Sequence, residues 1–355
     1  MNRPDYPRDP AQEQRLSAEH LRELTQQILI KNRMFPGDAQ TAAARMVESD
    51  LRGIDSHGTR ALKRYLLAMQ ACDIDPRAEV VVETDTPAIA VLNGGSGLGH
   101  VASTQAMKLA CEKAAAVGIG AVVLRKSHHY GCCGVYAMLA AEQNMIGYTT
   151  TSAGLPNVIA YGSTAGGETN HGFAWATPLP GRAPFVLDTA VAVSAWGKIE
   201  SLGMYGRTIP EGWALDAGGN PTTDPSAASL IFPLSGPVGF GLGLVSSLLT
   251  GGLAGGKWAI EKTRGSNVEG AEHFFQAIDL SKFVELDKYN ARASSAIEKL
   301  KALPPAEGFD RVCYPGEREA ERARDSEENG IPLHQKHVTL LEELAIQHKV
   351  EIPWK

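Results

Sequence analysis

The sequence predicts a mixed α/β protein in which a helical region is followed by a longer region of alternating strands and helices. In the first part of the chain, apolar residues recur with helical spacing, which predicts helices at 17–31, 38–51 and 60–69. After Pro76, short β-branched and apolar runs alternate with helical segments. The 37 glycines among 355 residues indicate many turns and close backbone approaches.

The second region begins with a β-rich run at 80–84, and its elements follow in chain order. Strands are expected at 88–92, 120–124, 146–151, 173–176, 185–187 and 273–278. Helices are expected at 102–116, 135–143, 190–199, 239–253, 280–300, 316–328 and 333–345. The stretch 206–225, rich in Pro, Gly and Asp, is expected to be a loop.

A glycine run at 94–99 precedes an expected helix but does not fit the dinucleotide-binding pattern G-x-G-x-x-G at any register. It forms either a tight turn or a set of backbone amides that meet an anion. A cofactor enzyme of this composition therefore needs a phosphate-binding element other than the Rossmann one.

Composition restricts the class of protein. A length of 355 residues allows about two domains. The net charge of −6 argues against a nucleic-acid or membrane-surface partner, and no apolar run reaches the ~18 residues of a membrane span. The polar, proline-containing start lacks the apolar stretch of a signal peptide, so residues 1–16 are expected to be a disordered tail. Five cysteines without framework spacing point to reduced thiols in a cytoplasmic protein: Cys72, Cys111, Cys132, Cys133 and Cys313.

The triplet Ser56-His57-Gly58 interrupts what otherwise reads as one long helix. Gly53 and Gly58 bracket two helix-capping residues, Asp55 and Ser56, so the backbone turns at this point. The ring of His57 can then project into a cleft, where an imidazole can give and take a proton near neutral pH. The alternative is that His57 only satisfies hydrogen bonds of the loop.

Several separated blocks of sequence resemble a known family in their order and spacing. They are 50–58, 127–131 with Gly134 and Tyr136, 169–178, 186–199, 209–216, 219–225, 236–242, 314–317 and 329–331. Together they resemble the malate/L-lactate dehydrogenase family that lacks a Rossmann fold. That family includes ureidoglycolate, sulfolactate and diketogulonate oxidoreductases. The resemblance covers about residues 17–350, and the ureidoglycolate dehydrogenases look nearest.

The resemblance implies a fold, a cofactor and an assembly. The fold is a helical domain, expected at 17–75 with 325–355, and a cofactor-binding domain at 76–324 built on a large, mainly antiparallel sheet. The cofactor is NAD or NADP, with NAD favoured. The protein is expected to be a homodimer whose site lies at the subunit interface.

The resemblance also implies residue roles. His57 and His129 match histidines proposed as the general acid/base, and Asp188 matches a carboxylate proposed to orient the catalytic histidine. The positions that match cofactor contacts are Ser152, Pro184, Leu187, Asp188, Thr189, Ala190, Pro237, Val238, Gly316 and Glu317.

The implied reaction is hydride transfer between nicotinamide and C2 of a small polar 2-hydroxy acid, of the malate, lactate, ureidoglycolate or sulfolactate type. Such a substrate needs a cation for its carboxylate. Relatives commonly have Arg four residues after the motif histidine, where this chain has Ala61, so Arg60 and Arg64 are the candidates beside Ser56. Val238 stands where many relatives have Lys.

Four other interpretations remain. The first is reduction of a cyclic imino acid, and the second is a non-catalytic binding protein on the same fold. A metal site at His128, His129, Cys132 and Cys133 is not expected, because adjacent side chains diverge. A hydrolase using Ser56 and His57 is disfavoured, because neighbouring residues align poorly and no G-x-S-x-G motif occurs.

Overall fold

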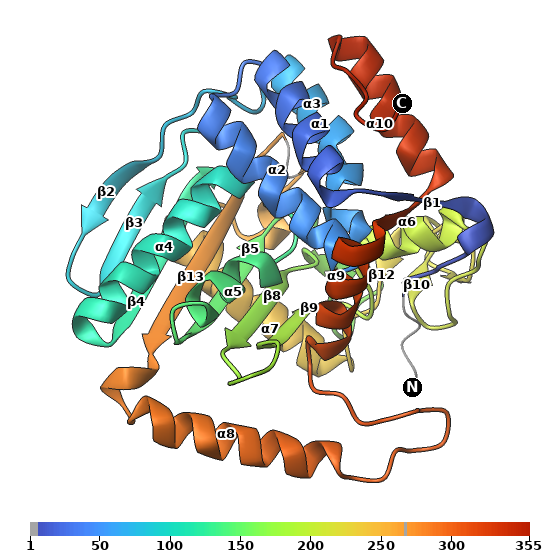
Figure 1. Cartoon of the computed structure of the whole chain (residues 1–355). Coiled ribbons are helices and arrows are strands. Elements are labelled where there is room, and N and C mark those ends of the chain that lie inside the picture. Colours follow the sequence, from blue (N-terminus) through green and yellow to red (C-terminus); the bar gives the residue numbers. More distant parts are fainter. Residues whose placement is uncertain (1–5, 266–267) are drawn as a thin grey trace.

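A seven-stranded sheet forms the centre of the computed structural model, which describes residues 6–265 and 268–355 (Figure 1). Its strand order is β2-β3-β4-β13-β5-β8-β9. The strands are β2 (Val81–Asp85), β3 (Ile89–Asn93), β4 (Ile119–Ser127), β5 (Met145–Ser152), β8 (Gly172–Thr177), β9 (Phe185–Ala190) and β13 (Ala271–Asp279). Only β3 and β4 pair in parallel in this sheet. The predicted mixed fold with a mainly antiparallel sheet is confirmed.

Alternating side chains of the sheet pack on two sides. Val122 and Leu124 of β4 are buried with α4 (Gly99–Val117) and α5 (Gly134–Ala141), which cover one face (Figure 1). Val123 points the other way and packs with Phe274 near α7 (Pro237–Ser247) and the π-helical turn η4 (Leu248–Gly252). The glycine run before α4 is a tight turn, in which the N–H of Gly97 donates to the Gly94 carbonyl. The N–H groups of Gly94 and Ser96 donate to carbonyls near the end of β4.

A second apolar core joins the two ends of the chain. It is formed by α1 (Ala18–Lys31), α2 (Pro36–Leu51), α3 (Leu62–Gln70) and α10 (Gln335–His348). The helix α9 (Glu317–Asn329) precedes this last helix. The helices predicted at 17–31, 38–51 and 60–69 are therefore present, because their apolar stripes face one another.

The N-terminal segment differs from the predicted disordered tail. Residues 1–5 lie outside the described residues, but η1 (Pro10–Gln12) and β1 (Glu13–Leu16) follow, and β1 pairs antiparallel with β14 (Ile331–His334). Arg8 fixes this segment by donating to the Pro332 carbonyl at 3.0 Å. The same pairing explains why the helix predicted at 333–345 begins only at Gln335.

A small five-stranded sheet, in the order β11-β10-β12-β6-β7, lies beside the large one. Its strands are β6 (Val158–Ile159), β7 (Gly166–Glu168), β10 (Ala214–Leu215), β11 (Pro221–Thr222) and β12 (Leu230–Ile231). The predicted loop 206–225 therefore contains a hairpin. The predicted helix 190–199 is also wrong at its start: Val191 and Val193 make strand-like backbone bonds to Leu234 and Phe232, and α6 (Trp196–Met204) begins later.

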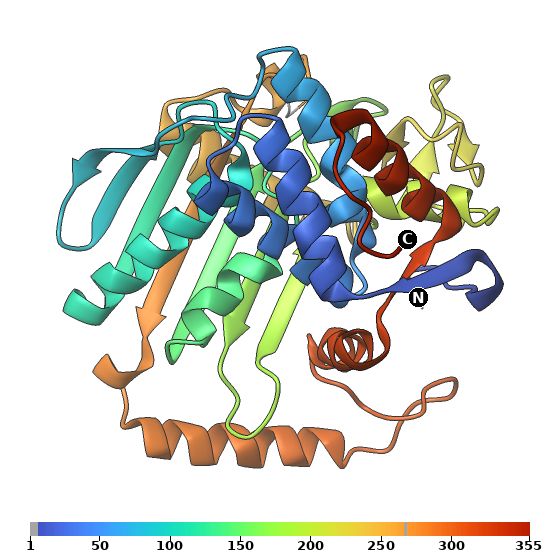
Figure 2. The same cartoon turned by 45° about the horizontal axis from the view of Figure 1, so that its top comes forward.

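The helix α8 (Leu286–Lys301) runs across the ends of the strands (Figure 2), where the Tyr289 hydroxyl lies 2.9 Å from that of Thr177. It has no buried residue. The remaining elements are short: η2 (Asp55–His57), η3 (Thr59–Ala61), η5 (Ala259–Glu261) and η6 (Leu280–Lys282). Within the described ranges, no helix combines the length and apolar character that crossing a bilayer requires.

Candidate active site

A cleft of about 550 Å³ lies between the helical core, the edge strand β9 and the start of α6. Many predicted site residues line it: Ser56, His57, Arg64, His129, Leu187, Asp188, Thr189, Ala190 and Gly316. The other predicted site residues are not part of its wall: Arg60, Ser152, Pro184, Pro237, Val238 and Glu317. The cleft therefore brings together both candidate histidines and a continuous stretch of β9.

The corner that carries His57 is built on a buried carboxylate. Oδ2 of Asp50, near the end of α2, accepts hydrogen bonds from the backbone N–H of Thr59 at 2.9 Å and from its hydroxyl at 2.6 Å. A Cβ at Gly58 would lie 1.9 Å from Asp50 Oδ1, so only glycine fits there. Burial raises the pKa of Asp50 to about 7, against the lowering effect of the Thr59 bonds. The hydrogen bonds of Asp50 thus fix the backbone of the corner.

His57 is the inner end of a chain of hydroxyl groups. Its Nδ1 lies 2.7 Å from Ser56 Oγ, which lies 2.6 Å from the hydroxyl of Tyr6. Burial, and then the positive charges of Arg64 and Arg60, lower the pKa of His57 to about 4. His57 is therefore neutral at pH 7 and able to accept a proton.

His129 follows β4 and stacks near His57, with 5.7 Å between ring centroids. Its Nδ1 accepts a hydrogen bond from the N–H of Gly131 at 3.3 Å and lies 2.7 Å from the Tyr65 hydroxyl. A backbone N–H can only donate, so neutral His129 carries its hydrogen on Nε2. Burial, and then the neighbouring His57, hold its pKa well below the usual range. The two rings therefore differ in the role of Nδ1.

Asp188 does not have the predicted partner. Its Oδ2 accepts hydrogen bonds from the N–H of Gly134 at 2.7 Å and from the Cys132 thiol at 2.8 Å. Burial raises its pKa. Because these partners belong to the segment after His129, Asp188 fixes that segment, and its described hydrogen bonds do not reach either candidate imidazole. The prediction that it orients the histidine directly is corrected to an indirect role.

Of the two candidate cations, only Arg64 faces the cleft. Its side chain is exposed on α3, and the described residues give it no ion-pair partner. Arg60 instead donates to the Ser201 hydroxyl and to the Gly197 carbonyl, both at 2.8 Å. Arg60 therefore joins the His57 corner to α6, and the prediction that it binds substrate is not supported by its position.

The adjacent His and Cys pairs that were considered as a metal site, 128–129 and 132–133, make other contacts. Cys132 donates to Asp188, and Cys133 accepts from the Tyr130 hydroxyl at 3.0 Å. Among the described residues, no three His, Cys, Asp or Glu side chains converge as a metal site would require.

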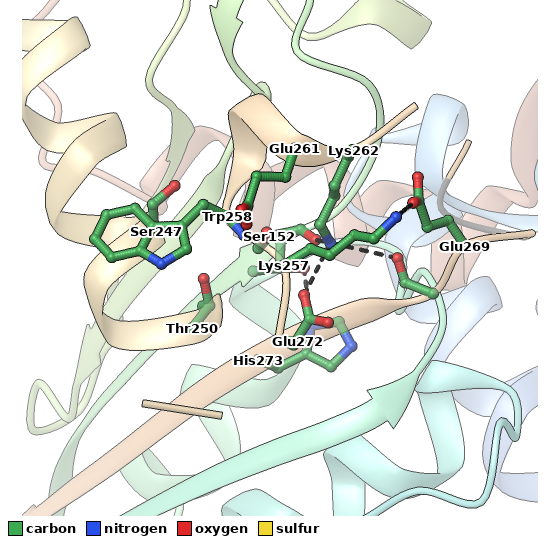
Figure 3. Close-up of polar contacts among 12 residues, drawn as sticks. Ser152, Ser247, Thr250, Lys257, Trp258, Glu261, Lys262, Glu269, Glu272 and His273 are labelled. Carbon is green, nitrogen blue, oxygen red and sulfur yellow. Dashed lines mark hydrogen bonds and ion pairs between the residues drawn. The ribbon is translucent and has the colours of Figure 1, made fainter. Parts of the chain in front are cut away.

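The end of β5 pairs with the start of β13, and Figure 3 shows polar contacts of this region. The buried Lys262 donates to the Ser152 carbonyl at 2.6 Å and pairs with Glu272 at 2.8 Å (Figure 3). His273 lies 2.8 Å from the Thr151 hydroxyl and 3.0 Å from the His128 carbonyl. Ser152 is therefore a buried anchor and not a cleft residue, while His273 supports the residue before His129.

The remaining predicted cofactor positions also have other surroundings. Glu317 forms an ion pair with Lys301. Pro237 and Val238 begin α7, where Val238 is 58% exposed. Sequence reasoning missed Tyr6, Tyr65 and Asn157, all of which contact or line the site. No sequence motif marks these three residues. Asp50, in contrast, stands in the same sequence block as His57.

Comparisons with known proteins agree with this architecture. The malate dehydrogenase of Pyrococcus horikoshii is 35% identical over 328 residues, covering 88% of this chain and 90% of that protein. Its solved structure superposes with a TM-score of 0.88 at 31% identity, covering 99% of both chains. The NAD(+) ureidoglycolate dehydrogenase of Escherichia coli is 29% identical over 329 residues, covering 90% and 92%. It is less similar than the malate dehydrogenase, contrary to the sequence expectation.

The fold and these relatives define the chain as a dehydrogenase, an oxidoreductase that uses a nicotinamide cofactor and a small-molecule substrate. The family model for malate/L-lactate dehydrogenase matches residues 16–342. The chain therefore belongs to the malate/L-lactate dehydrogenase family.

The cleft contains groups that fit a nicotinamide. Oδ1 of Asn157 is buried, lines the cleft and has no hydrogen-bond partner among the described residues. β9 is the edge strand of the large sheet, and its residues 187–190 line the same wall. An edge strand offers backbone donors and acceptors in alternation. A carboxamide carries one donor group and one acceptor, so the two features match it.

Proposed function

We propose that this enzyme interconverts a small 2-hydroxy acid and its 2-oxo acid, with His57 as the proton-transfer group and His129 as a hydrogen-bond donor. The supporting observation is the pair of imidazoles 5.7 Å apart in one cleft, whose Nδ1 atoms have different surroundings. His57 Nδ1 faces a hydroxyl that can accept or donate. His129 Nδ1 faces a backbone N–H that only donates.

His57 acts as the base in the oxidation direction. Its Nδ1–H donates to Ser56 Oγ, which leaves the lone pair of Nε2 for the proton of the substrate hydroxyl. The O–H bond breaks and its proton moves to Nε2. The C2–H bond breaks, its electron pair leaves with the hydrogen as hydride, and the C=O bond forms. Bound nicotinamide supplies the hydride acceptor for C2. In reduction, the imidazolium of His57 returns the proton to the oxygen.

His129 stabilises the oxygen on which charge develops. Its Nε2–H donates to that oxygen, because Nδ1 is occupied by the Gly131 N–H. The ring does not need to change protonation state, which agrees with a pKa held well below the usual range by burial. The loop is fixed from the other side by Asp188.

Arg64 binds the substrate carboxylate. A guanidinium without an ion-pair partner at the cleft wall is suited to bidentate contact with a carboxylate. Its positive charge is one cause of the low pKa of His57. Pairing with the substrate offsets this charge, so the pKa of His57 rises in the complex. This supports proton transfer in both directions near neutral pH.

NAD is the proposed cofactor, since the name of the E. coli relative specifies NAD(+). Asn157 and the 187–190 edge would hold its nicotinamide, and Gly316 borders the same cleft. The preferred substrate is of the malate type, after the P. horikoshii relative. The division into a helical domain (17–75 with 325–355) and a cofactor domain (76–324) remains a proposal. The five unpaired cysteines support the cytoplasm as its location.

A substrate panel tests this proposal. Malate, sulfolactate, lactate and ureidoglycolate are assayed with NAD+ and with NADP+ by absorbance at the reduced cofactor's band, and a cyclic imino acid is assayed in reduction. We expect the highest kcat/KM for a dicarboxylic 2-hydroxy acid with NAD+. The same acid with its C1 carboxylate replaced by an amide should react poorly, because Arg64 then has no carboxylate to pair with. Equal rates for acid and amide contradict the role of Arg64.

We further propose a homodimer formed through an apolar stripe on α7 and the segment after it. Members of the stripe are between 38% and 62% exposed: Val238, Leu242, Val245, Leu248, Leu253 and Ile260. On α7 they follow helical spacing, and an apolar surface of this kind is typical of an interface. Pro237 and Val238 begin this stripe, so the predicted cofactor contacts there belong to the interface.

Light scattering after gel filtration tests the dimer. The variant Val245→Asp places a charge in the stripe and should yield monomers. The control Ile346→Asp changes an apolar side chain that is 70% exposed on α10, and it should leave the mass unchanged. A dimer mass for Val245→Asp contradicts this interface.

A further inference from the structure

The N-terminal segment supplies a residue to the cleft from outside the part of the chain that matches the family model. Tyr6 lines the cleft, whereas the family match begins at residue 16. The segment is tied down two residues later, because the Arg8 guanidinium lies 3.9 Å from the Asp55 carboxylate and 3.7 Å from that of Glu13. Tyr6 therefore reaches the cleft from outside the region that the family model matches.

Tyr6 contacts two side chains of the site. Its hydroxyl lies 2.6 Å from Ser56 Oγ, the atom that lies 2.7 Å from His57 Nδ1. The Nζ of Lys198, which also lines the cleft, lies 5.2 Å from the centroid of the Tyr6 ring. The phenol ring is thus fixed with its oxygen on Ser56.

We propose that Tyr6 is a positioning residue that selects the Nδ1–H tautomer of His57 through Ser56. This inference rests on the proposed role of His57 as the base. The Ser56 hydroxyl has one hydrogen, and the described residues offer it two acceptors, Tyr6 oxygen and His57 Nδ1. When Ser56 donates to Tyr6, its oxygen accepts from Nδ1–H, and Nε2 is left as the basic nitrogen.

Removing the Tyr6 hydroxyl changes this balance. Ser56 then keeps only Nδ1 as an acceptor for its hydrogen, and this bond stabilises the Nε2–H tautomer, which cannot accept the substrate proton at Nε2. The same loss destabilises the imidazolium, because its Nδ1–H donates into a shorter hydrogen-bond chain. Both effects lower the apparent pKa of His57 and lower kcat.

The charged and titratable groups around His57 come from several elements, and His100 of α4 is one of these groups. Arg60 and Arg64 lie on the segment that follows it, and His129 stacks beside it from the β4 loop. Asp55 precedes it, and Lys198 of α6 lies over Tyr6. Replacing a phenol by a phenyl group leaves all of these in place, so a changed pH profile reports the hydroxyl chain.

The test compares Tyr6→Phe with a matched control, Tyr289→Phe. The Tyr289 hydroxyl also contacts a side-chain hydroxyl, Thr177 at 2.9 Å, but it lies on α8 and does not line the cleft. For Tyr6→Phe, kcat should fall about 10-fold, with KM for cofactor unchanged. In reduction, the decline of kcat with pH should begin about 0.5–1 pH unit lower. Tyr289→Phe should match the wild type.

A double-mutant cycle separates this role from a structural one. If Tyr6 acts through Ser56, Tyr6→Phe has little further effect on kcat in a Ser56→Ala background. An equal loss in both backgrounds, or a wild-type pH profile for Tyr6→Phe, overturns the inference while leaving His57 as the base. Full turnover in His57→Gln overturns the proposed function itself.

Discussion

The two imidazoles of the cleft are held by different kinds of support. His57 lies at a corner between helices and is held by side chains, namely Ser56, Tyr6 and the buried Asp50 beneath the corner. His129 follows a central strand, and its Nδ1 accepts from a backbone N–H in addition to lying 2.7 Å from the Tyr65 hydroxyl. Hydroxyl groups can reverse their hydrogen bonds, whereas a backbone N–H cannot. We therefore expect His57 to exchange a proton with the substrate and His129 to act only as a hydrogen-bond donor.

Replacing His57 should have the largest effect. In His57→Gln, kcat should fall by roughly 10³-fold in both directions, because the base and acid are lost. Binding of reduced cofactor, followed by fluorescence, should change little, and circular dichroism should show a wild-type fold. Retained turnover would mean that proton transfer does not run through this corner.

Replacing His129 should cost less and should be partly reversible by choice of residue. In His129→Leu, kcat should fall by about 10²-fold, the usual cost of one lost donor to a developing charge. His129→Gln keeps an N–H donor and should recover part of this loss. Steady-state kinetics of both variants decide the comparison. A greater loss for His129→Leu than for His57→Gln would exchange the two roles.

Arg64 should affect binding and the pH profile together. In Arg64→Gln, KM for the acid substrate should rise by ~10- to 100-fold, since a charge-assisted contact is lost. Because Arg64 helps to lower the pKa of His57 to about 4, the acid limb of kcat/KM for oxidation should move to higher pH. Lys63→Gln, an exposed neighbour on the same helix, is the control. An unchanged KM would show that another group binds the carboxylate.

The parts of the fold that depend on local pattern could be predicted from the sequence. The helices at 17–31 and 38–51 carry apolar stripes, and the strand at 120–124 is a short apolar run, so neighbouring residues alone determine them. The run 190–193 alternates Ala and Val, which fits a strand as well as a helix, and the lateral bonds of Val191 decide for a strand-like path.

The parts that depend on distant pairing could not be predicted. β1 forms because Glu13 pairs with His334, and no local signal marks that partner. The same holds in the site: both histidines were predicted and line the cleft, but a tyrosine from far along the chain takes part in holding each of them. Tyr6 is 50 residues from Ser56, and Tyr65 is 64 residues from His129. A motif identifies the reactive group, and only packing identifies what holds it.

The smallest effect is expected at Asp50 and concerns stability rather than turnover. Burial raises its pKa from 3.8 to about 7, so between these values the folded protein holds a proton that the unfolded chain has released. The Asp50 contribution to the free energy of unfolding therefore falls as pH rises through this window, and it is lowest above pH 7. Asp50→Asn cannot ionise, yet its amide oxygen can still accept both Thr59 hydrogen bonds.

The melting temperature of Asp50→Asn minus that of the wild type should therefore increase by roughly 2–4 °C as pH rises from 5 to 8. Turnover should stay within about 3-fold, because the hydrogen bonds that hold the His57 corner are kept. Asp50→Ala, which loses both bonds to Thr59, should lower kcat further and serves as the comparison. If the curves of melting temperature against pH run parallel for wild type and Asp50→Asn, the carboxylate is ionised throughout. The hydrogen bonds that hold the His57 corner would then be accepted by a charged carboxylate at every pH in this range.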